Sequence, residues 1–285
     1  MTEHGMLFSA PVVRALLEGS KTQTRRPMKP QPFADVIFDD TTGEWGQFWW
    51  SADFKGDPTV ENWKDLKCPY GQIGDRIWVR ETWRFGAWRD DGRFAIDYAS
   101  SPEITNTPWV RNNNDDSGDD AYSWLERIDS ELTSKGVLSD ENGIYHWESG
   151  QSPLKWHPSI HMPRWASRIT LEITDVRVQR LQEISEEDSE AEGIDKYHRR
   201  DCRTFSPIYN ADGVFTEPGD CSCSGHSLEE IYEDLWNSIY GLREGGRKTH
   251  NKAHLAALKD YSWDANPWVW ALTFKVLPEH IPVRS

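Results

Sequence analysis

Residues 165–181 read WASRITLEITDVRVQRL, and this stretch carries the clearest strand pattern in the chain. Apolar residues alternate with polar ones from Ile169 onward, and the apolar series continues past Asp175 to Leu181. Because side chains of a strand point alternately to its two faces, a period of two predicts a strand with one buried face. We therefore expect a long central strand here, with the rest of the fold arranged around it.

Weaker patterns extend this picture in both directions. Alternation and turn signals predict short strands at 5–10, 76–81, 94–98 and 267–276, and amphipathic spacing predicts helices at 11–18, about 121–134, 185–193 and 228–239. Residues 31–70 look aromatic and irregular, and polar insertions are expected near 31–65, 100–152, 195–226 and 242–262. The element order predicts an α+β class, with one domain over residues 1–285 built around a curved sheet or small β-barrel.

Composition narrows the class of protein. The chain has 285 residues, 32 Lys and Arg against 47 Asp and Glu, and a formal net charge of −15. Strong duplex DNA binding is not expected of so acidic a chain, since that affinity comes from neutralising phosphates. No apolar run approaches the length of a membrane span, and the start of the chain lacks the pattern of a secretory signal. We expect a cytoplasmic protein without membrane partners.

A basic cluster follows the first predicted helix. Residues 16–26 read LLEGSKTQTRR, and residues 11–30 carry five basic side chains and one acidic side chain. Lys21 and Thr24 are three positions apart on a turn, where a buried, neutral amine can accept the proton of a hydroxyl. The alternative is a solvated basic loop at a helix C-terminus, which the helix dipole favours.

An acidic helix supplies a second group of candidates. Six acidic residues lie between positions 183 and 192. Those in the first turn suit a helix N-terminus, but Glu192 lies at the opposite end, where the dipole disfavours a carboxylate. Glu192 is therefore either ordinary surface charge or a carboxylate with another task.

Four stretches in this order carry a resemblance to a known family: LLEGSKTQTRR, YGQIGDRIWVRETW, LQEISEEDSEAEGI and WALTFKV. They resemble the ASCH domain, which is related to the PUA fold, a small β-barrel that binds RNA. The longer stretches SIHMPRWASRITLEITDVRVQRL and SWDANPWVWALTFKV resemble ASCH proteins encoded by phages and prophages. The resemblance covers about half of the chain and implies an ASCH/PUA-like β-barrel with flanking helices and polar insertions.

One branch of this family comprises small bacterial amidohydrolases that act on N4-acetylcytidine. Residues 19–26, GSKTQTRR, match that branch's Gly-x-Lys-Thr-x-Thr-x-Arg motif at every fixed position. The resemblance implies that Lys21 is the base, Thr24 the nucleophile and Glu192 the residue that orients Lys21. No cofactor is implied for catalysis, and the implied partner is a nucleoside or single-stranded RNA. The alternatives are a non-catalytic RNA-binding module of phage origin and, less well supported, a virion assembly factor.

Further residues are candidates for substrate binding: Arg26, Glu81, Trp83 and Arg164. A carboxylate such as Glu81 can accept from the amino group of cytosine, and tryptophans such as Trp83 can stack on a base. The alternatives are a strand-end ion pair of Glu81 with Arg76 or Arg84, and plain packing for Trp83, since the chain has 16 Trp.

A third cluster combines cysteine and histidine within one polar insertion. Cys202, Cys221, Cys223 and His226 would supply the four ligands of a structural zinc ion. Free thiols in a loop are the alternative, because Cys-x-Cys is not the usual spacing of a zinc finger.

The zinc hypothesis predicts a metal content. Elemental analysis of the purified protein should find about one zinc per chain, since all four positions of a tetrahedral site would be filled by protein. A metal-free protein of native activity would contradict the hypothesis.

Overall fold

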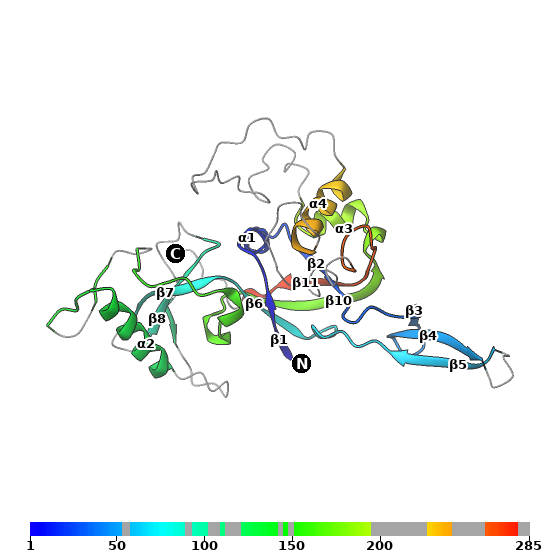
Figure 1. Ribbon diagram of the computed structural model, residues 1–285, viewed down its shortest axis with the longest axis horizontal. Coiled ribbons are helices and arrows are strands. Elements are labelled where there is room, and N and C mark those ends of the chain that lie inside the picture. The colour runs from blue at the N-terminus through cyan, green and yellow to red at the C-terminus, as the bar shows by residue number, and fades with distance from the viewer. Residues whose placement is uncertain are drawn as a thin grey trace. The chain divides into compact units, whose positions relative to one another are not determined.

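The computed structural model describes residues 1–52, 58–88, 93–101, 109–111, 121–141, 145–147, 151–194, 227–240 and 260–278 (Figure 1). The chain divides into two compact units. Unit 1 comprises Met1–Leu17, Asp75–Glu172 and Val276–Ser285, and unit 2 comprises Glu18–Gly74 and Ile173–Lys275. The long strand β10 (Thr170–Arg180) passes from unit 1 into unit 2, so the stretch with the clearest strand pattern contributes to both.

In unit 1, the sheet order is β1-β6-β10. Strand β1 (Glu3–Leu7) runs parallel to β6 (Arg76–Arg80), and β6 pairs antiparallel with the start of β10. Ile77 and Val79 are buried while their neighbours in β6 are half-buried, which is the alternation expected of a strand with one core face. Helix α1 (Ala10–Glu18) buries Val13 and Leu16. The expected strands at 5–10 and 76–81 and the expected helix at 11–18 are thus confirmed, with bounds shifted by at most three residues.

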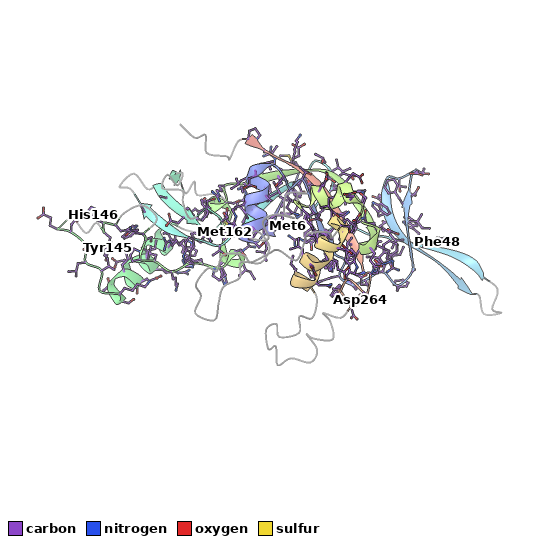
Figure 2. The ribbon with its side chains drawn as sticks, turned by 90° about the horizontal axis from the view of Figure 1, so that it is seen from above. Met6, Phe48, Tyr145, His146, Met162 and Asp264 are labelled. Carbon is purple, nitrogen blue, oxygen red and sulfur yellow. The ribbon has the colours of Figure 1, made fainter. Side chains whose placement is uncertain are left out.

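Unit 1 also contains an aromatic core. Strands β7 (Trp83–Trp88), β8 (Arg93–Tyr98) and β9 (Trp109–Arg111) form an antiparallel sheet, and helix α2 (Ala121–Ser134) matches the predicted helix. Short 3-10 turns occur at η1 (Ser159–His161) and η2 (Arg164–Ala166). The cluster is built largely from side chains of these elements, and Figure 2 labels one of its members, Met162.

In unit 2, the sheet order is β10-β11-β2. The closing strand β11 (Trp268–Val276) pairs antiparallel with β2 (Gln23–Pro27), so Leu272 lies opposite Thr24. Helix α3 (Glu186–Ala191) contacts both β2 and helix α4 (Leu228–Tyr240), and the 3-10 turn η3 (Leu181–Glu183) precedes α3. A core of Leu181, Ile184, Ile194, Leu228, Tyr232, Trp236 and Val269 joins these elements.

Strands β3 (Asp35–Asp39), β4 (Glu44–Ala52) and β5 (Pro58–Asp65) form a separate antiparallel sheet in unit 2 (Figure 1). The turn from β3 to β4 is closed by Gly43, whose φ is 72°, and by the Asp39 carboxylate, which accepts from the Thr41 amide at 2.8 Å. Gly46 lies against the Trp63 ring, and an added Cβ would overlap that ring. The aromatic residues in this region therefore belong to strands.

Three expectations need correction. Much of the stretch 31–70 is regular, because residues 35–39, 44–52 and 58–65 form β3 to β5 around the turn at Gly43. The basic cluster is not a turn throughout, because residues from Gln23 onward form β2 against β11. The class is α+β as expected, but the described strands form open sheets and no closed barrel.

The aromatic core of unit 1 predicts a difference between two leucines. Leu132 is fully buried in it, whereas Leu138 is 88% exposed. Leu132→Ala should lower the free energy of unfolding by about 2–5 kcal/mol through the cavity it leaves. Leu138→Ala should change it by about 0.5 kcal/mol or less. Chemical denaturation followed by tryptophan fluorescence measures both, and equal losses would contradict this packing.

Candidate active site

The backbone just before β2 pairs with the end of α3. Gly19 has a φ of 77°, a left-handed conformation that lets the chain turn away from the preceding helix. Lys21 and Glu192 then form an isolated antiparallel bridge, and the Thr22 amide donates to the Ala191 carbonyl at 2.8 Å. Two segments that are 171 residues apart in the sequence therefore share one short stretch of backbone pairing.

Helix α3 presents its last carboxylate to this junction. Ser185 caps the helix by accepting from the Asp188 amide at 3.1 Å, and acidic residues fill the first turn, where the dipole stabilises them. Glu192 is the C-cap, where the dipole offers no such stabilisation. Its carboxylate instead meets a cation, which accounts for an acid at the unfavourable end of the helix.

Among the residues that the structure describes, Glu192 is the hydrogen-bond partner of the Lys21 ammonium. Its Nζ donates to the Glu192 carboxylate at 2.5 Å and to the Glu192 carbonyl oxygen at 2.8 Å, and both side chains are about 4% exposed. Burial lowers the pKa of Lys21, and the charges of Arg26 and Arg25 add to this effect. The Glu192 carboxylate opposes the shift but does not cancel it, so the pKa of Lys21 lies below its ordinary value.

Arg25 connects Glu192 to a second carboxylate. Its guanidinium lies 2.5 Å from Asp188 and 3.3 Å from Glu192. Asp188 also accepts from Gln23 at 3.1 Å and from Arg177 at 3.0 Å. Burial by itself would raise the pKa of Asp188, but the Arg177 hydrogen bond and the Arg25 charge lower that pKa by more, so the net shift is downward. Asp188 therefore stays ionised and takes the closer ion pair with Arg25.

Two tyrosines of helix α4 contact these charged residues of β2 and α3. The Tyr232 hydroxyl donates to Glu192 at 3.4 Å, and its ring lies 5.9 Å from the Arg25 guanidinium. Burial raises the pKa of Tyr232 well above its ordinary value, so this phenol remains a neutral donor. Arg26 donates to the Tyr240 hydroxyl at 3.3 Å. Tyrosines two helical turns apart thus contact the motif's carboxylate and its last arginine.

Thr24 is buried but is not joined to Lys21 by a hydrogen bond. Its side chain is 4% exposed, and its hydroxyl makes no hydrogen bond to any residue that the structure describes. Alternation along β2 places Thr24 and Arg26 on one face and Gln23 and Arg25 on the other. The structure thus brings Lys21 and Glu192 into contact, and it places Thr24 on the adjoining strand.

Glu81 lies in unit 1 and is already fully engaged. Its carboxylate accepts from Arg168 at 2.9 and 3.2 Å and also from the Ser100 hydroxyl, and the residue is 1% exposed. The ion pair weighed for Glu81 is therefore present, but its partner is neither Arg76 nor Arg84. With both oxygens bonded, the carboxylate has no room for a cytosine amino group.

The other two substrate candidates in unit 1 also have partners within it. Trp83 is fully buried, so the stacking prediction is corrected to packing: ring centroids at 5.0–5.9 Å surround it, from Phe85, Trp124, His157 and Trp165. Arg164 donates to the Glu3 carboxylate at 2.8 Å and to the Thr170 hydroxyl at 3.2 Å. Arg26, in unit 2, is the substrate candidate that adjoins Thr24 on β2.

The metal hypothesis concerns residues outside the described ranges. Cys202, Cys221, Cys223 and His226 all fall there. Within the described ranges, no cluster of three or more histidine, cysteine or acidic side chains could hold a metal ion. Cys68 is a free thiol whose pKa burial raises to about 11, so it stays protonated.

Three members of the cluster were not predicted from the sequence: Arg25, Asp188 and Tyr232. Arg25 and Asp188 stood inside quoted motifs, and recognising β2 as a strand would have separated the Arg25 face from the Thr24 face. Tyr232 belongs to a helix whose apolar spacing was recognised, but nothing local links that helix to Glu192.

The buried pair predicts a large effect of one neutral substitution. Glu192→Gln removes the carboxylate that Lys21 and Arg25 share, so unfolding should become easier by about 3 kcal/mol or more. The pKa of Lys21 should fall further, because the group that raises it is gone. Glu186→Gln, on the exposed first turn, is the matched control and should cost about 1 kcal/mol or less. Denaturation and NMR titration of Lys21 measure these effects, and equal losses would contradict the buried pair.

Comparison of the chain with models of known protein families, with curated proteins and with solved structures gave no match. None of the helices in the described ranges is long and apolar enough to cross a lipid bilayer. The proposed function therefore rests on this chain's own residues, above all on the cluster formed by Lys21, Glu192, Arg25, Asp188 and Tyr232.

Proposed function

We propose that this chain is a nucleobase-recognising hydrolase that removes an acyl group from N4-acylated cytosine or cytidine. Thr24 is the nucleophile and Lys21 the base. The observation that carries the proposal is the Lys21 ammonium, which is buried against the Glu192 carboxylate beside two arginines and has a lowered pKa. A lysine in such surroundings loses its proton more readily than a solvated one, which is what a general base requires.

The reaction balances with these groups. Neutral Lys21 accepts the proton of the Thr24 hydroxyl as the oxygen bonds to the acyl carbon. The bond from that carbon to N4 then breaks, and the proton on Lys21 passes to the leaving cytosine amine. Water hydrolyses the acyl ester of Thr24 and restores the free hydroxyl. The substrate must draw Lys21 and Thr24 into hydrogen-bond contact, since catalytic contacts often tighten only in the complex.

Glu192 positions Lys21 in this scheme. Its second carboxylate oxygen is held by Arg25 at 3.3 Å and by Tyr232 at 3.4 Å, which fixes the first oxygen against Lys21. Arg26 shares a face of β2 with Thr24, so it is the residue proposed to bind the substrate. Glu81 and Trp83 have no part in the proposal. The Glu81 carboxylate is already bonded to Arg168, and the Trp83 ring is fully buried.

The family, origin and cellular location of the chain are part of the same proposal. The motif GSKTQTRR supports an ASCH protein of phage or prophage origin with a PUA-like core, acting in the cytoplasm. A structural zinc in the insertion at 195–226 accompanies it as a separate proposal. A nucleoside fits a chain of net charge −15 better than a long RNA does, because a small pocket needs few cations.

A non-catalytic RNA-binding module is the second candidate. One observation favours it: the Lys21 ammonium already donates two hydrogen bonds to Glu192, and no hydrogen bond joins Lys21 to Thr24 in the described part of the chain. In that case the ion pair would hold α3 to β2 and would perform no chemistry.

Hydrolysis of N4-acetylcytidine separates the two candidates. Thr24→Ala and Lys21→Ala should each lower turnover by about 10²–10⁴-fold, while Glu192→Gln lowers it by about tenfold, because an orienting group is partly replaceable. Thr22→Ala is the matched control, since Thr22 is exposed one residue after Lys21. Nucleoside binding should survive in Thr24→Ala, as measured by calorimetry.

Two results would count against the hydrolase. Full activity in Thr24→Ala would rule out this nucleophile, whatever the substrate. An inactive wild type on every acylated cytosine, combined with RNA binding, would establish the non-catalytic module instead.

The pH profile tests the base. Only neutral Lys21 can accept a proton, so kcat should rise with pH through the Lys21 pKa and then level off, and burial puts that pKa below the ordinary value of lysine. In Glu192→Gln the pKa falls further, so the rising limb should move to lower pH. A shift of the limb to higher pH would contradict the assignment of Lys21 as the base.

A further inference from the structure

Unit 1 contains a cavity that shares no residue with the Lys21–Glu192 site. Its volume is about 850 Å³, within the range of sites that bind small molecules. Helix α2 forms one wall, β7 contributes Phe85, and residues 154–161 form the rest.

The buried part of the cavity lining is apolar, and one of its side chains has an unsatisfied donor. Phe85, Ile128, Leu154 and Trp124 form this apolar lining, and the Trp124 ring packs edge-on against His157 at 5.5 Å. The indole N–H of Trp124 is buried without a hydrogen-bond partner in the described structure. Buried donors are nearly always paired, so an acceptor on a bound molecule is a natural partner for this one.

His157 adds a second polar group beside the apolar lining. Its imidazole makes no hydrogen bond to a described residue, although its ring packs against the Trp83 and Trp124 rings, which also contact each other. Burial lowers the pKa of His157, and the charges of Lys155 and His161 lower it further against the opposing charge of Glu131. His157 is thus neutral near pH 7 and offers one N–H and one lone pair, which suits the edge of a heteroaromatic ring.

The rim of the cavity supplies cations. Arg127 and Lys155 are these cations, and His161, Glu126 and Glu131 line the rim beside them. Glu131 is already engaged, because it accepts from Lys135 Nζ at 2.7 Å and from the Lys155 amide at 2.9 Å, and its other oxygen lies 4.0 Å from the Lys155 ammonium, whose side chain is 67% exposed. The rim therefore offers ammonium and guanidinium groups to an anion in a chain that is acidic overall.

We propose that this cavity binds a planar heteroaromatic anion of the nucleoside monophosphate class. The base lies on the apolar lining and accepts from the Trp124 indole, and its edge meets His157. The phosphate meets Lys155, Arg127 and His161 at the rim. This site is independent of the proposed hydrolysis and would remain if that proposal failed.

Calorimetric titration with CMP tests the proposal on the full-length protein. CMP should bind at least about tenfold more tightly than cytidine or inorganic phosphate, because both halves of the ligand contribute. Lys155→Gln should weaken CMP about tenfold and leave cytidine unchanged. Trp124→Phe, which keeps an aromatic ring but removes the donor, should weaken both about tenfold. Lys64→Gln, the same substitution at an exposed lysine of β5, is the control.

Four outcomes would overturn the site. They are no binding of CMP, equal binding of CMP and cytidine, equal binding of CMP and phosphate, and CMP binding that neither Lys155→Gln nor Trp124→Phe alters. The Lys21→Ala variant separates this site from the proposed active site. If Lys21→Ala abolishes CMP binding, CMP binds at the Lys21 site and the cavity proposal is wrong. Neither result bears on the hydrolase proposal, which hydrolysis by the wild-type protein tests.

Discussion

The buried ion pair between Lys21 and Glu192 is the constraint on which the rest of unit 2 depends. Two charges removed from water are tolerated only when each has a partner and its remaining hydrogen-bonding capacity is filled. Lys21 uses the carboxylate and the carbonyl of the same residue, and Glu192 is completed by Arg25 and Tyr232. Satisfying these groups fixes the start of β2 against α3 and brings α4 over both. The same arrangement lowers the pKa of Lys21, so the contacts that hold the fold also prepare the proposed base.

Much of the fold could be predicted from local patterns. The alternation from Ile169 onward gave β10, and the spacing at residues 228–239 gave α4 to within one residue, because in both cases the apolar period reflects a single buried face. β2 was missed because its sequence, QTRRP, is polar and forms a strand only through pairing with β11. β3 to β5 were missed because aromatic residues without regular alternation resemble a loop, although the turn at Gly43 carried a signal.

The site was predictable only where the motif and the helix dipole agreed. Lys21 and Glu192 were identified by the motif and by the unfavourable position of one carboxylate. Asp188 looked like a helix N-terminal acid, and it is one, but it also binds Arg25 and Arg177 from two other strands. Glu81 was a candidate for substrate binding, with an ion pair to Arg76 or Arg84 as the alternative, and its partner proved to be Arg168, 87 residues further along the chain. Side chains that meet through tertiary contacts leave no trace in local spacing.

The central claim is that Thr24 carries the acyl group during turnover. The most direct measurement is mass spectrometric peptide mapping of wild-type protein quenched with acid during reaction with N4-acetylcytidine. The mechanism predicts one acetyl group on the peptide containing residues 21–26, located at Thr24 by fragmentation and absent from Thr24→Ala. Turnover without any acetylated Thr24, or with the acetyl group on Lys21, would contradict it.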